Sequence, residues 1–183
     1  GLSGRTPWHQ DAGVLSQKGQ KYTDLITCWI PFTKTTKKNG CMITVPGLQK
    51  KGLFNHDADP KGQAYIRNSE LLNKLKTVAL EANPGDIVLL SKHTVHCSLP
   101  NISNNFRISM DLRYHKSGQP SGRDLLPNFC VRSKNKKNIK IYNFKQWLTL
   151  WEKAKQKCIP KKYTFKYQTP TFKGKKRDLV NLL

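Results

Sequence analysis

Residues 83–114 read NPGDIVLLSKHTVHCSLPNISNNFRISMDLRY, and this stretch decides the fold class. Its last segment, FRISMDLRY at 106–114, alternates apolar and polar side chains, which is the pattern of a half-buried strand. Residues 86–90 form a second β-like run. The Asn-Pro-Gly at 83–85 places Pro and Gly at the two central positions of a type II turn. The stretch therefore predicts consecutive short strands joined by tight turns.

Further short strands are predicted on the N-terminal side of this stretch. Residues 24–32 (DLITCWIPF), 41–45 (CMITV) and 77–82 are rich in β-branched or aromatic residues and are bounded by turn signals. Residues 49–63 carry Gly, Pro and Asp and are expected to be irregular, while residues 69–76 fit one or two helical turns. Many short strands with turns between them favour a β-sandwich, a jelly roll or a small barrel.

The C-terminal part has a different pattern. Residues 143–157 predict one amphipathic helix with Asn143 as its N-cap, and we expect its two tryptophans to pack on the barrel. Its apolar positions follow helical spacing: Phe144, Trp147, Leu148, Trp151 and Ala154. The last twenty residues are basic and aromatic and are expected to be extended. We divide the chain into a β core over residues 1–130 and a basic helix and tail over residues 131–183.

The charge is large and unevenly distributed. The formal net charge is +22, and residues 131–183 hold 16 Lys and Arg against 2 acidic residues. Such a segment is typical of contact with nucleic acid, an anionic surface or an acidic substrate, although a solvated lysine-rich surface explains the same composition. Five cysteines without a C-x-x-C spacing, no long apolar run and no leader-like segment favour a reducing compartment, and we expect a cytoplasmic protein without a transmembrane span.

Three residues have the chemistry of metal ligands. His9 and Asp11 form an H-x-D pair, and two residues apart on a strand face the same side, so both would point inward if this segment is a barrel strand, while Gln10 would face away. A distant histidine, His96, would then supply the third ligand. Two imidazoles and one carboxylate on one face of the metal are the ligand set of non-haem Fe(II) oxygenases.

Beyond His96, residues of a second group suit an organic acid. Arg107 and Ser109 are two apart in an alternating strand and share a face, and a guanidinium binds a carboxylate through two parallel hydrogen bonds. Ser98 and Ser109 could add neutral donors. Arg113 lies six residues after Arg107, an even separation, so it competes for the role of carboxylate clamp.

Spacing alone leaves other interpretations open. An isolated H-x-D arises by chance in a chain with five histidines, and a lone histidine is more often structural than a ligand. On composition alone His56, His93 and His115 are alternative ligands. Arg107 could also be an ordinary surface residue.

Four ordered segments carry a family resemblance. They are PWHQDAG at 7–13, TCWIPFTKTTKKNGCMITVPG at 27–47, NPGDIVLLSKHTVHCSLPNIS at 83–103 and FRISMDLRY at 106–114. In content, order and spacing they resemble the phytanoyl-CoA dioxygenase family of Fe(II)- and 2-oxoglutarate-dependent oxygenases. The resemblance implies a mainly β fold, a double-stranded β-helix, which is a cupin-like jelly-roll barrel, followed here by the C-terminal amphipathic helix.

The resemblance also implies roles for individual residues. His9, Asp11 and His96 would bind Fe(II), and Arg107 would bind the distal carboxylate of the co-substrate 2-oxoglutarate. Trp29 and Ser98 would line the co-substrate pocket. The implied enzyme is a dioxygenase that uses O2 to hydroxylate a small-molecule or acyl-thioester substrate, expected to be anionic, and releases succinate and CO2. Ascorbate is a candidate stimulant of turnover.

The chain departs from the family pattern before His9. Family members usually carry helices and strands ahead of the H-x-D segment, whereas this sequence begins at Gly1 without an initiator methionine. We therefore expect that the usual N-terminal segment is missing. Two alternative functions stay open: a nucleic-acid-binding protein that uses its basic surface, with residues 163–177 as the most suitable stretch, and an inactive oxygenase fragment. Iron-dependent turnover of 2-oxoglutarate separates the enzyme from both.

Overall fold

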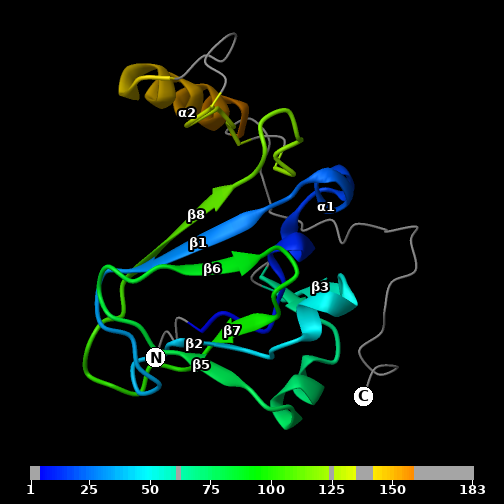
Figure 1. The fold of residues 1–183 in the computed structure, drawn as a ribbon, viewed down its shortest axis with the longest axis vertical. Helices are drawn as coiled ribbons and strands as arrows, with labels where there is room; N and C mark the ends of the chain where they lie inside the picture. The colour runs from blue at the N-terminus through cyan, green and yellow to red at the C-terminus, as the bar shows by residue number, and fades with distance from the viewer. Residues whose placement is uncertain (1–4, 61–62, 124–125, 135–141, 159–183) are drawn as a thin grey trace.

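A computed structural model describes residues 5–60, 63–123, 126–134 and 142–158. The predicted basic tail and residues 163–177 lie outside these described residues. Short strands and helical turns make up most of the fold, and one longer helix follows them (Figure 1). The mainly β prediction is confirmed. None of the helices in the described ranges is both long enough and apolar enough to cross a membrane.

The first sheet has the strand order β6-β1-β8, and both strand pairs are antiparallel. Its strands are β6 (Val88–Ser91), β1 (Ile26–Pro31) and β8 (Ser109–Tyr114). Across the β1–β8 ladder Thr27 is paired with Arg113, and Trp29 is paired with Asp111. Paired residues of antiparallel neighbours project from the same side, and every second residue shares that side, so these four side chains lie on one face of the sheet.

The second sheet has the order β5-β2-β7 and is also antiparallel. Its strands are β5 (Val78–Leu80), β2 (Met42–Thr44) and β7 (His96–Ser98). A separate hairpin pairs β3 (His56–Ala58) with β4 (Ala64–Ile66). The helical elements are η1 (Asp11–Val14), α1 (Gln17–Tyr22), η2 (Leu48–Lys51), η3 (Ser69–Lys74) and α2 (Phe144–Cys158).

Two apolar clusters hold these layers together. Trp29 of β1, Leu90 of β6 and Met42 of β2 pack in one cluster, so the first and second sheets face each other across it. The other cluster joins the second sheet to the hairpin, η3 and the segment before His9; its buried members are Trp8, Val45, Phe54, Ile66, Leu72, Val95 and Cys97. The second sheet therefore supports the chain segment that carries His9.

The turn predicted at residues 83–86 is present. The Asp86 N–H donates to the Asn83 carbonyl at 3.1 Å, and Gly85 has a φ of +93°. A positive φ at the third position is what a type II turn requires, and glycine adopts it without strain. The turn delivers the chain into β6 and so fixes where the first sheet begins.

Helix α2 begins directly after the predicted cap. The Gln146 N–H donates to Asn143 Oδ1 at 3.0 Å, and the Asn143 N–H donates to Gln146 Oε1 at 3.1 Å. This reciprocal pair is a capping box. The described ring contacts of Trp147 are with Phe144 and Trp151, at centroid separations of 5.8 and 6.1 Å, and Trp151 is exposed. The structure therefore does not confirm the expectation that both tryptophans pack on the β core.

Of two further expectations, the closed barrel is not confirmed and the irregular loop differs from the structure. Within the described residues the strands form two sheets and a hairpin with no ladder joining the sheets, so a closed barrel stays a prediction. Residues 49–63, expected to be irregular, contain part of η2 and the whole of β3. Strand β3 was missed because it is only three residues long and reads His-Asp-Ala, without the β-branched or aromatic residues that mark a strand.

Candidate metal centre

The backbone brings His9 and His96 together. The two residues form an isolated antiparallel bridge, in which the His9 N–H donates to the His96 carbonyl at 2.9 Å and the His96 N–H donates back at 3.0 Å. Their ring centroids lie 4.2 Å apart. Because His96 is the first residue of β7, the second sheet holds both imidazoles in place.

Asp11 reaches the same point by a different route from the one expected. His9 is only a one-residue bridge, and Asp11 begins the 3-10 helix η1, so the two do not share a strand face. The chain turns because the Gly13 N–H donates to the Gln10 carbonyl at 2.8 Å. The strand expectation was therefore wrong for Asp11, although the expected grouping of the three side chains is present.

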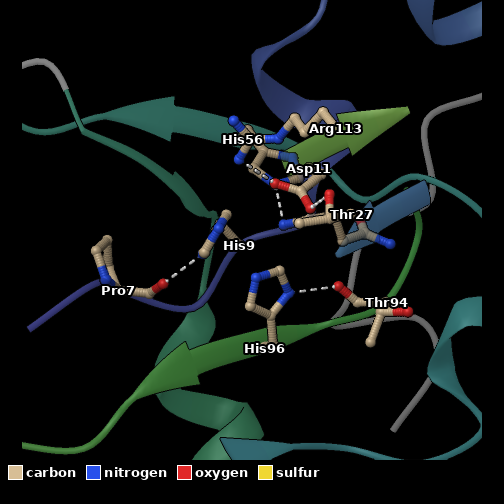
Figure 2. A network of polar contacts seen from close by, with 9 residues as sticks. Pro7, His9, Asp11, Thr27, His56, Thr94, His96 and Arg113 are labelled. Atoms are coloured by element: carbon tan, nitrogen blue, oxygen red, sulfur yellow. Dashed lines mark hydrogen bonds and ion pairs between the residues drawn. The ribbon is translucent and has the colours of Figure 1, made fainter. Parts of the chain in front are cut away.

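Each imidazole is oriented by a carbonyl two residues earlier in the chain. Nδ1 of His9 lies 2.9 Å from the Pro7 carbonyl oxygen, and Nδ1 of His96 lies 2.9 Å from the Thr94 carbonyl oxygen (Figure 2). A carbonyl only accepts, so Nδ1 must carry the hydrogen. In the neutral ring Nε2 then keeps its lone pair, which is the tautomer that a metal needs.

The Asp11 carboxylate is fixed through both of its oxygens. The Thr27 hydroxyl donates to Oδ2 at 2.5 Å, and the Arg113 guanidinium donates to Oδ1 at 2.8 Å (Figure 2). The Asp11 side chain is 1 % exposed, so these bonds replace the water it has lost. Thr27 was missed in the sequence. Its even spacing from Trp29 along β1 was the signal that Thr27 faces the same cavity as Trp29.

The protonation states suit a cation. Burial lowers the pKa of His9 to about 4, assisted by the proximity of His96, and burial also lowers the pKa of His96. Burial alone would raise the pKa of the Asp11 carboxyl, but the Arg113 guanidinium and other neighbours outweigh it, so that pKa is lowered. Near neutral pH the centre therefore contains two neutral imidazoles and one ionised carboxylate.

These three side chains fit a divalent metal. Each offers one ligand atom, and the three ligand atoms all lie within 4.8 Å of one another. Two neutral nitrogens and one anionic oxygen match the requirement for deprotonated ligands. The donor set also matches a 2-His-1-carboxylate site, which leaves further coordination positions open.

Gln10 stabilises the chain segment that carries His9 and Asp11 through hydrogen bonds on the side away from the candidate metal ligands. Its Nε2 donates to the carbonyls of Gly52 and His93, both at 2.8 Å, and its Oε1 accepts from the Phe54 N–H at 2.8 Å. The Gln10 N–H donates to Nε2 of His56 at 3.0 Å. Gln10 does face away from the metal ligands, as expected, but it is fully buried and ties the His9 segment to two loops.

A cavity of about 290 Å³ adjoins the three ligands. The residues assigned to 2-oxoglutarate from the sequence all line it: Trp29, Ser98, Arg107 and Ser109. Arg107 donates through one guanidinium nitrogen to Ser109 Oγ at 3.0 Å, while Ser98 Oγ accepts from the Thr6 N–H at 2.7 Å. A larger, open hollow of about 530 Å³ between residues 33–39 and 103–106 contains none of the metal ligands.

Two arginines enter the same cavity with different partners. Arg113 is paired with Asp11, whereas Arg107 is bonded only to a neutral serine within the described contacts. Arg107 therefore remains the more suitable group for an incoming carboxylate. The other histidines stay outside the ligand group: His56 bonds to the Phe54 carbonyl and the Gln10 N–H, and His115 bonds to a neighbouring carbonyl.

Comparisons with known proteins find relatives that are named dioxygenases. The chain is 35% identical over 121 residues to a phytanoyl-CoA dioxygenase domain-containing protein 1 homolog of Dictyostelium discoideum, covering 62% of this chain and 41% of that protein. It is 29% identical over 116 residues to a 2-aminoethylphosphonate dioxygenase of an uncultured bacterium, covering 63% and 42%. The chain thus spans about two fifths of the length of these relatives.

Solved structures show the same fold at lower identity. A non-heme monooxygenase, ThoJ, aligns with a TM-score of 0.54 and 17% identity over 84% of this chain and 60% of that one. EvdO2 from Micromonospora carbonacea var. aurantiaca, complexed with 2-oxoglutarate, aligns with a TM-score of 0.50 and 18% identity, covering 66% and 51%. The family model for phytanoyl-CoA dioxygenase matches residues 1–109. The chain belongs to the phytanoyl-CoA dioxygenase family.

Proposed function

We propose that this chain forms the core of an Fe(II)- and 2-oxoglutarate-dependent dioxygenase that hydroxylates a small-molecule or acyl substrate and releases succinate and CO2. The observation that carries the proposal is the grouping of His9, Asp11 and His96 beside a cavity that also contains Arg107. Membership of the dioxygenase family supports it. An iron(II) ion held by the three ligands would supply the redox chemistry that activates O2.

The protein's own contribution is binding, orientation and exclusion of water. His9 and His96 offer nitrogens that their backbone bonds keep unprotonated, and Asp11 offers a carboxylate that Thr27 and Arg113 hold in one orientation. Arg107 binds the distal carboxylate of 2-oxoglutarate, with Ser109 orienting its guanidinium. Trp29 contributes an apolar wall, since its side chain is buried and lines the cavity.

The nature of the substrate is a separate part of the proposal. The net charge of +22 attracts anions over long distances and would speed the encounter with an anionic small molecule or acyl thioester. Such steering concerns the whole substrate and weakens as salt rises. The division of the chain at residue 130, the cytoplasmic location and stimulation by ascorbate remain predictions.

The proposal is tested by succinate formation from 2-oxoglutarate with Fe(II) and ascorbate across a panel of acids, acyl thioesters and phosphonates. Arg107→Leu should raise the 2-oxoglutarate concentration needed for half-maximal rate on the order of 30-fold or more, because the co-substrate carboxylate loses its charged partner. Metal affinity should stay nearly unchanged. Arg113→Leu is the matched comparison, since that residue is paired with Asp11 instead.

Three results would contradict the proposal or its residue assignments. If Arg113→Leu raises the 2-oxoglutarate concentration needed for half-maximal rate more than Arg107→Leu does, then Arg113 and not Arg107 binds the co-substrate carboxylate. Metal binding without any succinate formation would favour the inactive fragment. A salt-sensitive mobility shift with DNA or RNA in the absence of turnover would favour the nucleic-acid-binding alternative.

A further inference from the structure

A second carboxylate enters the metal cavity from β8. Asp111 lines the cavity together with Arg107, Ser109 and Arg113; Ser109, Asp111 and Arg113 alternate along β8, and Arg107 precedes that strand. The ladder pairs Asp111 with Trp29, whose buried side chain lines the same cavity. Alternation and pairing therefore agree that the Asp111 side chain is on the inner face of the first sheet.

The other charged side chains that line the cavity have partners in the protein. Asp11 is bonded to Thr27 and Arg113, and Arg107 is bonded to Ser109. In the described part of the chain the Asp111 carboxylate has no hydrogen bond and no ion pair. With Nε2 of His9 and Nε2 of His96 assigned to the metal, Asp111 is a charged acceptor in this cavity that remains available to a ligand.

The surroundings of Asp111 favour a ligand that carries hydrogen-bond donors. Partial burial raises the pKa of the Asp111 carboxyl, the nearby Arg113 guanidinium lowers it, the Asp11 carboxylate raises it and the Arg107 guanidinium lowers it, while the residue as a whole remains exposed. A carboxylate without a protein partner accepts a hydrogen bond from an ammonium or hydroxyl group of a ligand, whereas the Asp111 charge itself repels a carboxylate or phosphate.

We propose that Asp111 is a specificity-determining residue that binds a hydrogen-bond donor of the substrate, with an ammonium group as the best match. The inference rests on the proposed function, because it assigns the metal ligands and Arg107 to Fe(II) and 2-oxoglutarate and leaves Asp111 for the substrate. It narrows the substrate class to molecules that present an amine or hydroxyl group beside the reacting carbon. Such a molecule can still be anionic elsewhere.

The test uses the full chain under anaerobic conditions with Mn(II) and 2-oxoglutarate. The probes are linear alkylammonium ions and linear alkanecarboxylates of matched length. Calorimetric titration gives their affinities, and proton relaxation caused by Mn(II) reports whether they bind near the metal. The wild-type protein should bind the ammonium ions more tightly than the carboxylates. Asp111→Asn should weaken ammonium binding about tenfold, the loss expected for one charge-assisted hydrogen bond, and should narrow the gap to the carboxylates.

Two variants serve as controls. Glu152→Gln, on α2, removes the same charge outside the cavity and should leave both affinities unchanged. Asp111→Glu retains the charge and should retain the preference for ammonium.

Other results would overturn the inference. These are equal binding of both probe classes by the wild type, or an ammonium preference that survives in Asp111→Asn. A loss of Mn(II) affinity in Asp111→Asn would show that the residue acts by positioning Arg113 instead. Failure of the wild type to bind Mn(II) would contradict the proposed function. In that case calorimetry without metal would still test whether Asp111 gives a preference for ammonium ions.

Discussion

At the scale of single residues, the orientation of Asp11 depends on groups that are not themselves ligands. Thr27 donates to one carboxylate oxygen and Arg113 to the other, so the carboxylate has little freedom to rotate. Partners of this kind keep a ligand in the geometry that the metal requires. The centre is therefore a property of β1 and β8 as well as of the three ligands.

Thr27→Val should weaken metal binding with little change in shape. Valine is close to threonine in volume but cannot donate to Oδ2 of Asp11, and loss of such a partner typically costs 10- to 100-fold in metal affinity. We expect about tenfold for Mn(II), measured by anaerobic titration. Thr27→Ser keeps the hydroxyl and should bind nearly as tightly as the wild type. Equal loss in both variants would contradict this role.

Gly13 is required because the His56 ring occupies the space of a side chain. A Cβ added at Gly13 would lie 2.4 Å from Cδ2 and 2.5 Å from Nε2 of His56, and Nε2 also accepts from the Gln10 N–H. Gly13→Ala should lower the free energy of unfolding by about 1–3 kcal/mol through overpacking. Denaturant unfolding measures this change.

A double-mutant cycle separates this clash from a general effect at Gly13. Removing the ring in His56→Ala should make the further change Gly13→Ala nearly neutral, since the two residues are in contact. Additive losses in the double variant would show that the ring is not what excludes the methyl group.

Residue chemistry was easier to predict from the sequence than residue geometry. The donor types of His9, Asp11 and His96 follow from the letters, and they do lie together. The route of Asp11 through a 3-10 helix did not follow, because it depends on Gln10 and on a histidine 43 residues after Gly13. The partner of Arg113 likewise depends on a contact across 102 residues, which local periodicity cannot reveal.

At the scale of secondary-structure elements, strong local patterns were sufficient and weak ones were not. The β-branched and aromatic residues of β1, the alternation in β8 and the turn at residues 83–86 predicted real elements with errors of a few residues. Strand β7 was not predicted, although its first residue belongs to the candidate metal centre, because His-Cys-Ser has no β-branched residue. Its position is fixed instead by pairing with β2 and with His9.

The cap of α2 gives a prediction that belongs to this scale. Asn143→Ala removes the side-chain acceptor for the Gln146 N–H and should cost about 1 kcal/mol of helix stability. Amide hydrogen exchange of residues 144–147 should become correspondingly faster. Asn143→Ser retains an oxygen acceptor and should restore most of the protection. Unchanged exchange in Asn143→Ala would mean that the cap does not stabilise the helix.

At the scale of the whole molecule, stability and the metal centre are coupled through protonation. The pKa of His9 is lowered to about 4 and that of His96 is also lowered, so between about pH 4 and 6.5 the unfolded chain binds more protons than the folded one. The contribution of these two imidazoles to the stability of the metal-free protein is therefore fully present above pH 6.5 and is lost as the pH decreases toward 4.

This pH dependence can be measured by urea unfolding of the metal-free protein between pH 4.5 and 7.5. Each buried imidazole contributes at most about 1.4 kcal/mol per pH unit in that range. His9→Leu should flatten the curve, and the double variant His9→Leu/His96→Leu should flatten it further. A wild-type curve without slope below pH 6.5 would contradict the burial of neutral imidazoles.

Among the described residues, one face of the first sheet exposes apolar side chains, and this face is also a feature of the whole molecule. Ile26, Leu89, Met110 and Tyr114 are exposed on the side that faces away from the metal cavity. A net charge of +22 opposes association through such a surface, because like-charged molecules repel one another. The binding experiments therefore belong at moderate ionic strength, where long-range attraction of anions is largely screened.

The central claim is that His9, Asp11 and His96 bind one divalent metal, and an anaerobic titration with Mn(II) or Fe(II) tests it most directly. The wild type should bind one ion, and His96→Ala should abolish binding. His93→Ala is the matched control, three residues earlier in the chain, because only its backbone carbonyl bonds to Gln10. It should bind one ion with unchanged affinity. Unchanged binding in His96→Ala, or its loss in His93→Ala, would contradict the assignment.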